Sequence, residues 1–132
     1  MKTHVADAVA LARYLTDTVP PKADKAFADA KAGEAFILVP EIAIGEFVYI
    51  SLKGLLNVRD PKSEARELVR EINASTYFRP GAMDLAAWER FLDSGISEVH
   101  ERTIHSVARA NSADAIITSD PELKESGMAT IW

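Results

Sequence analysis

The sequence predicts an α/β protein of three layers, α/β/α, with a central parallel sheet. Short apolar runs of strand length alternate with stretches of helical periodicity, and these stretches are long enough to serve as crossover connections between parallel strands. The chain has 132 residues, of which 48% are hydrophobic and 27% charged. This composition is typical of a globular protein with one core, so we expect a single domain spanning residues 1–132.

The first half of the chain alternates strand and helix. Residues 2–6 predict a strand that ends at Asp7, and helical spacing of apolar residues follows. Pro20 and Pro21 break the chain before a second helix, which we expect to end at Gly33. Residues 35–39, AFILV, predict a buried strand, and a helix follows from Pro40.

The second half continues this alternation. Asp60 and Pro61 are typical of a helix start, and Asp84 is expected to cap a further helix that ends at Gly95. Ser97 is the expected cap of a last long helix. The remaining expected elements are strands, at residues 76–80, 114–119 and 128–132.

Composition excludes several classes of function. The chain has no cysteine, so it has no disulfide, thiolate zinc site or cysteine nucleophile. The net charge is −5, which is not typical of a general nucleic-acid binder. No apolar run approaches the roughly 18 residues of a membrane span, and Arg13 interrupts the apolar stretch near the N-terminus. We therefore expect a cytoplasmic protein without membrane contact.

Glu46 lies in a helix that is apolar almost all round. Its apolar neighbours between Pro40 and Leu52 leave no wide solvent face, so we expect the carboxylate to be buried. No Lys or Arg stands three or four residues away on the same helix. A buried carboxylate costs several kcal/mol unless it is neutralised or paired. Its partner must therefore come from another element.

Three further acids are expected near Glu46. Asp7 and Asp120 directly follow strands, and the carboxyl ends of parallel strands meet at one edge of the sheet. Glu101 lies early in the helix that leads to the second of these strands. Carboxylates gathered in one place repel one another unless a divalent cation lies between them. Oxygen-only donors suit Mg²⁺ or Mn²⁺ better than zinc.

The segments VADAVALARYL, PEIAIGEF, EVHERTIHSVARANSADAIITSD and MATIW, in this order, resemble the PIN domain family, and in particular compact toxins of the VapBC toxin–antitoxin type. The resemblance covers essentially the whole chain. It implies a Mg²⁺- or Mn²⁺-dependent ribonuclease that acts on RNA. It also implies a homodimer and a cognate antitoxin protein that covers the acidic site. The family's acidic positions fall on Asp7, Glu46, Glu101 and Asp120, as metal ligands and catalytic residues.

One position departs from the family pattern. Glu101 stands where the family usually has Asp, and its side chain is one methylene longer. The main hypothesis is hydrolysis of RNA phosphodiesters by a metal-activated water, with no covalent nucleophile. The alternative is a catalytically weak PIN-like module that binds RNA or protein. A phosphoacceptor receiver domain ranks below both, because the late strand carries no lysine at its end.

The same residues also have structural explanations that need no metal or RNA. Asp7 and Asp120 are also suitable helix caps, and Glu101 also suits the positive end of its helix. His100 and His105 are five residues apart, so they do not share the helical face that a zinc protease motif requires. We expect His100 to pack or to orient a ligand of the site. Lys62, Arg66 and Arg70 form a basic stripe that is either solvated or in contact with phosphate.

Overall fold

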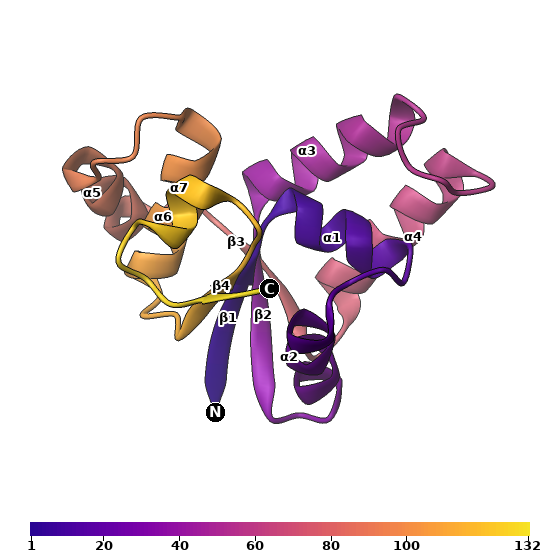
Figure 1. The fold of residues 1–132 in the computed structure, drawn as a ribbon, viewed down its shortest axis with the longest axis horizontal. Helices are drawn as coiled ribbons and strands as arrows, with labels where there is room; N and C mark the ends of the chain where they lie inside the picture. Colours follow the sequence, from indigo (N-terminus) through magenta and orange to yellow (C-terminus); the bar gives the residue numbers. More distant parts are fainter.

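The computed structural model describes all residues, 1–132. Its core is one five-stranded sheet in which every neighbouring pair of strands is parallel, so the predicted fold class is confirmed. The order is β3-β2-β1-β4-β5, and β1 runs upward from the N-terminus in Figure 1, so the carboxyl ends of the parallel strands face the same way. The strands are β1 (Lys2–Ala6), β2 (Ala35–Pro40), β3 (Phe78–Gly81), β4 (Ala115–Ile117) and β5 (Thr130–Ile131).

Seven helices cover the two faces of this sheet (Figure 1). One layer contains α1 (Ala8–Leu15), α2 (Pro21–Lys31), α3 (Glu41–Leu52) and α4 (Pro61–Ala74), and it encloses a cluster of 19 buried apolar residues. The other layer contains α5 (Leu85–Asp93), α6 (Val99–Ala110) and α7 (Pro121–Lys124) over a smaller cluster of six. The acidic residues of interest therefore lie where both layers meet the carboxyl edge of the strands.

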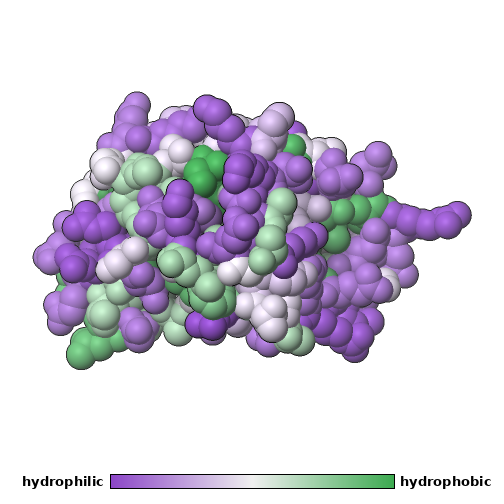
Figure 2. Space-filling view, turned by 90° about the horizontal axis from the view of Figure 1, so that it is seen from below, coloured by the Kyte–Doolittle hydropathy of each residue, from purple (hydrophilic) through white to green (hydrophobic).

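The surface at the opposite edge of the sheet is mostly hydrophilic. Figure 2 views the molecule from this side, and its apolar residues form small separate groups. No helix combines the length and the apolar character that crossing a membrane requires.

Most helix starts follow the expected capping residues. The side chains of Asp7, Asp60 and Asp84 each accept a hydrogen bond from the backbone N–H three residues on. One predicted cap was wrong. Glu98, not Ser97, caps α6, because the Glu98 carboxylate accepts two N–H groups of the first turn. Helix α5 ends at Asp93 with Ser94 as its C-cap residue, so Gly95 follows the helix end as expected. The last three strands have other bounds than expected, and the closing strand is shorter.

Helix α3 is less buried than its composition predicts. Only Ala43, Phe47 and Ser51 are fully buried, while Tyr49 and Leu52 are 62% and 58% exposed. The Glu46 side chain is itself 33% exposed. The expectation that Glu46 has no solvent face was therefore wrong for the single chain, because the outer side of α3 has no element packed over it.

Arg102 of α6 connects this helix to the end of α5 through hydrogen bonds. Its guanidinium donates hydrogen bonds to the carbonyl oxygens of Phe91 (2.8 Å), Ile96 (3.2 Å) and Leu92 (3.4 Å), and it lies over the Phe91 ring. The last carbonyls of a helix lack partners in the following turn, so Arg102 supplies a donor to Leu92 and a second donor to Phe91, which also accepts the Ser94 N–H. Arg102 thereby fixes the loop that leads into the first turn of α6.

We predict that Arg102→Met lowers the free energy of unfolding by about 1–3 kcal/mol, because the carbonyls lose charged donors while the aliphatic packing is kept. Urea denaturation followed by circular dichroism measures this change. Arg90→Met on the exposed side of α5 is the control, since Arg90 makes no hydrogen bond. Equal effects of the two substitutions would contradict the role given to Arg102.

Candidate active site

Asp7 follows β1 directly and is the most buried of the four predicted acids, at 5% exposure. Its Oδ1 accepts the N–H of Ala10 (2.8 Å), and its Oδ2 accepts a short hydrogen bond from the Thr118 hydroxyl. Burial raises the pKa of the Asp7 carboxyl, these hydrogen bonds oppose the rise, and the charge of Asp120 adds to it. The carboxylate is held firmly, and it has no cationic partner.

Asp120 follows β4, the strand that pairs with β1, and it lies at the same carboxyl edge of the sheet. Its Oδ1 accepts the N–H groups of Glu122 (2.9 Å) and Leu123 (3.1 Å) at the start of α7, while Oδ2 makes no hydrogen bond. Thr118 links the two aspartates, because its hydroxyl donates to Asp7 and accepts the Asp120 N–H (3.0 Å). The capping readings of Asp7 and Asp120 are therefore correct, and each cap uses one carboxylate oxygen.

Glu46 reaches the same region from α3. Its Oε1 is buried and makes no hydrogen bond. Burial raises the pKa of the Glu46 carboxyl, His100 opposes the rise, and the charges of Glu98 and Asp7 add to it. No Lys or Arg forms an ion pair with any of the four acids, since Lys25–Asp29 is the only ion pair of that kind in the structure. As expected, Glu46 has no ion pair within α3, and the basic side chain nearest to its carboxylate is His100 of α6, at 4.0 Å.

Glu101 lies in the first turn of α6, beside Glu98. Burial raises the pKa of the Glu101 carboxyl to about 7, helped by hydrogen bonding to Glu98 and by the charges of Glu98 and Asp120. The same contact with Glu101, together with the N–H groups of the helix start, lowers the pKa of Glu98 to about 2. One oxygen of Glu101, Oε2, is buried without a hydrogen-bond partner. Of this pair, Glu101 therefore holds the proton and Glu98 is the ionised carboxylate.

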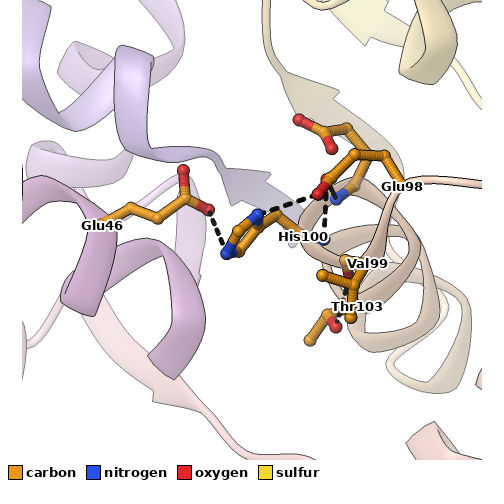
Figure 3. A network of polar contacts seen from close by, with 6 residues as sticks. Glu46, Glu98, Val99, His100 and Thr103 are labelled. Atoms are coloured by element: carbon orange, nitrogen blue, oxygen red, sulfur yellow. Dashed lines mark hydrogen bonds and ion pairs between the residues drawn. The ribbon is translucent and has the colours of Figure 1, made fainter.

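His100 stands between carboxylates of two elements (Figure 3). Its Nδ1 is 3.1 Å from Oε1 of Glu98, and its Nε2 is 4.0 Å from Oε1 of Glu46. His105 lies further along α6, is 8% exposed and does not join this group. The sequence-based rejection of a two-histidine zinc motif therefore agrees with the structure.

Two residues of this site were missed in the sequence. Glu98 was not distinguished from other surface acids. It stands three residues before Glu101, which is the spacing between a capping residue and an N–H group that it accepts. Thr118 was not among the predicted site residues. Its bridge between Asp7 and Asp120 depends on a side-chain rotamer, for which the sequence has no signal.

The donor set fits a hard divalent cation in its chemistry. Glu46 and Glu101 each have a buried oxygen without a partner, and Asp120 has a free one. As the side chains stand, no group of three or more acids and histidines is close enough together to hold a metal ion. Binding would therefore require rotation of the flexible glutamate side chains, while both aspartates are held by their caps.

Comparisons with known proteins find similar folds but no similar sequence. No model of a protein family matches the chain, and no curated protein sequence matches it. VapBC2 from Rickettsia felis, solved bound to a DNA fragment from its promoter, superposes with a TM-score of 0.71 at 12% identity, covering 97% of this chain and 96% of that one.

Two further solved structures have the same fold. VapC20 of Mycobacterium tuberculosis, a sarcin–ricin loop cleaving toxin, superposes with a TM-score of 0.66 at 17% identity, and 96% of each chain is covered. FitAcB from Neisseria gonorrhoeae superposes with a TM-score of 0.60 at 12% identity, covering 96% of this chain and 95% of that one.

The chain therefore has the PIN-domain fold, a three-layer α/β/α arrangement around a parallel sheet. Within that class, its fold is the one of VapC-type toxins. The resemblance predicted from the sequence is confirmed at the level of the fold.

The raised carboxyl pKa values predict how stability depends on pH. Between the ordinary Glu pKa of 4.5 and about 7, folded Glu101 keeps a proton that the unfolded chain has released. The contribution of Glu101 to the free energy of unfolding of the metal-free protein therefore falls as pH rises through this window. His4 and His105, whose pKa values are lowered by burial, act in the opposite direction.

We predict that Glu101→Gln removes part of this fall. Melting temperatures at pH 4.5 and pH 7, measured in a chelator, give the difference for wild type and variant. Their comparison isolates Glu101, because the histidine contribution is common to both. Glu89→Gln on exposed α5 is the control. A fall as steep in Glu101→Gln as in wild type would refute the assignment.

Proposed function

We propose that this protein is a metal-dependent endoribonuclease and the toxin of a VapBC-type toxin–antitoxin pair. The observation that carries the proposal is the set of four carboxylates at one sheet edge without any Lys or Arg partner, two of them with buried oxygens that make no hydrogen bond. The fold shared with VapBC2 and VapC20 supports the same reading.

Asp7, Glu46, Glu101 and Asp120 would hold Mg²⁺ or Mn²⁺ through carboxylate oxygens. A bound ion supplies a lowered pKa for an attacking water and offsets negative charge on the phosphate. Asp7 and Asp120 contribute rigid positions, because Thr118 and the helix N–H groups fix them. Glu46 and Glu101 have longer, flexible side chains, and each has an oxygen without a hydrogen-bond partner, so these side chains would rotate toward a bound ion.

Glu101 would serve as a ligand in its ionised form. A bound cation would stabilise that form and so lower the pKa of about 7 that the Glu101 carboxyl has in the metal-free chain. Its side chain is longer than the Asp usual in the family, and its buried Oε2 has no hydrogen-bond partner to hold it back from such a role. No residue needs to form a covalent bond to the substrate.

The shape of the site favours a large substrate. Five cavities of the molecule are lined by other residues, and none of the four acids lines any of these five. Small-molecule sites are usually enclosed clefts that bury most of the ligand. An open acidic edge instead suits a polymer such as RNA, whose phosphate would approach a bound cation.

We predict Mn²⁺- or Mg²⁺-dependent cleavage of structured RNA, and a loss of roughly 100-fold or more in kcat/KM for Glu46→Gln, because a ligand of the ion is removed. A panel of hairpin RNAs that includes a sarcin–ricin loop, with chelator as the blank, measures this. Glu41→Gln, an exposed acid in the first turn of the same helix, is the control.

Equal background in wild type and Glu46→Gln would contradict the enzyme. That result would favour the catalytically weak PIN-like module, which binds RNA or protein without cleaving. The absence of a pre-assembled three-donor group is the observation on the side of this alternative.

The homodimer remains part of the proposal, and exposed apolar side chains support it. Leu85 and Leu92 on α5 are 75% and 72% exposed, and Trp88 and Val99 are about half exposed. Apolar groups gathered on a surface are typical of protein interfaces. An antitoxin would in addition need a cationic segment to cover the acidic edge.

We predict that the wild-type chain is dimeric in light-scattering chromatography and that Leu92→Glu shifts it toward monomer, because a charge would be buried at the interface. Glu89→Gln on the same helix should leave the dimer intact. A monomeric wild type at micromolar concentration would refute the dimer without bearing on cleavage.

A further inference from the structure

The ring of His100 is oriented by Glu98 and faces Glu46 (Figure 3). An ionised carboxylate accepts hydrogen bonds and donates none, so in the neutral ring, the form that can bind a metal, the contact with Glu98 places the hydrogen on Nδ1. The lone pair of Nε2 is then left on the side of Glu46. Neither nitrogen is needed to stabilise α6, whose first turn is capped by Glu98.

This arrangement is the usual one for a histidine that binds a metal. Such a histidine donates its other ring N–H to a carboxylate or carbonyl, which fixes the ring and makes the free nitrogen more basic. Glu98 is itself fixed, because its Oε2 accepts the N–H groups of His100 (2.8 Å) and Glu101 (3.3 Å). The orientation of the imidazole is therefore built into the start of α6.

The separation of the two free donor atoms suits one cation. Donors about 2.1 Å from an octahedral ion stand about 3.0 Å apart when adjacent and about 4.2 Å apart when opposite. His100 Nε2 and Glu46 Oε1 are 4.0 Å apart, which is too long for a hydrogen bond and within the span of one ion. Glu46 Oε1 also has no other partner.

We propose that His100 supplies a nitrogen donor to the cation held by Glu46, and that this donor makes the site favour Mn²⁺ over Mg²⁺. The inference rests on the proposed function, because it concerns the cation of the same site. Imidazole nitrogen binds first-row transition metals well, whereas Mg²⁺ is bound mainly through oxygen and water. A set of carboxylates with one imidazole therefore discriminates between ions that a purely acidic set would treat alike.

Titration calorimetry with Mn²⁺ and separately with Mg²⁺ tests the preference. His100→Gln should raise the Kd for Mn²⁺ roughly 10–100-fold and leave the Kd for Mg²⁺ within error. Glu98→Gln should weaken Mn²⁺ binding by a smaller factor, since the amide oxygen still accepts the ring N–H. Glu89→Gln is the matched control, and melting curves of the metal-free variants establish that each is folded.

Proton NMR of the Co²⁺-loaded protein tests the bond itself. A histidine bound through Nε2 shows a strongly shifted Nδ1–H resonance that disappears in D₂O. The chain has three histidines, so loss of this resonance in His100→Gln assigns it. The resonance should persist in Glu89→Gln.

The outcomes separate the inference from the nuclease. Metal-dependent cleavage with an unchanged Mn²⁺/Mg²⁺ preference in His100→Gln, and no shifted N–H resonance, would overturn the inference alone and leave His100 as a counter-charge to Glu46. Absence of cation binding and of cleavage in wild type would overturn both.

Discussion

Repulsion between carboxylates at the carboxyl edge of the sheet is the constraint on which the rest of the site depends. The parallel order places β1 beside β4, so that the acids that follow these strands are neighbours. Burial and like charge both disfavour ionisation there, and no Lys or Arg relieves it. The fold therefore maintains an arrangement that is unfavourable by itself, which is typical of a site that awaits a positively charged ligand.

The site combines fixed and adjustable parts. Hydrogen bonds from helix N–H groups and from Thr118 hold the two aspartates, whereas the longer acids have oxygens without partners. His100 is the one group of opposite polarity between α3 and α6, and Glu98 sets its orientation. Positioning by groups outside the donor set is common in metal sites and limits the reorganisation needed on binding.

Much of the fold was predictable from the sequence, because apolar periodicity and helix caps are local signals. The parallel topology that these signals predict places Asp7 and Asp120 at one edge of the sheet. Other features depended on tertiary packing. The exposed side of α3 could not be predicted, since an apolar helix is equally compatible with a covered and an uncovered position. The roles of Glu98 and Thr118 depend on rotamers, which the sequence does not specify.

The double role of Asp7 and Asp120 has a practical consequence. Each caps a helix, and removal of a capping side chain costs about 0.5–2 kcal/mol. A variant of the chain that loses one of the four carboxylates without losing a helix cap is therefore best made at Glu46. Its carboxylate caps no helix, and a glutamine there preserves the shape of the scaffold.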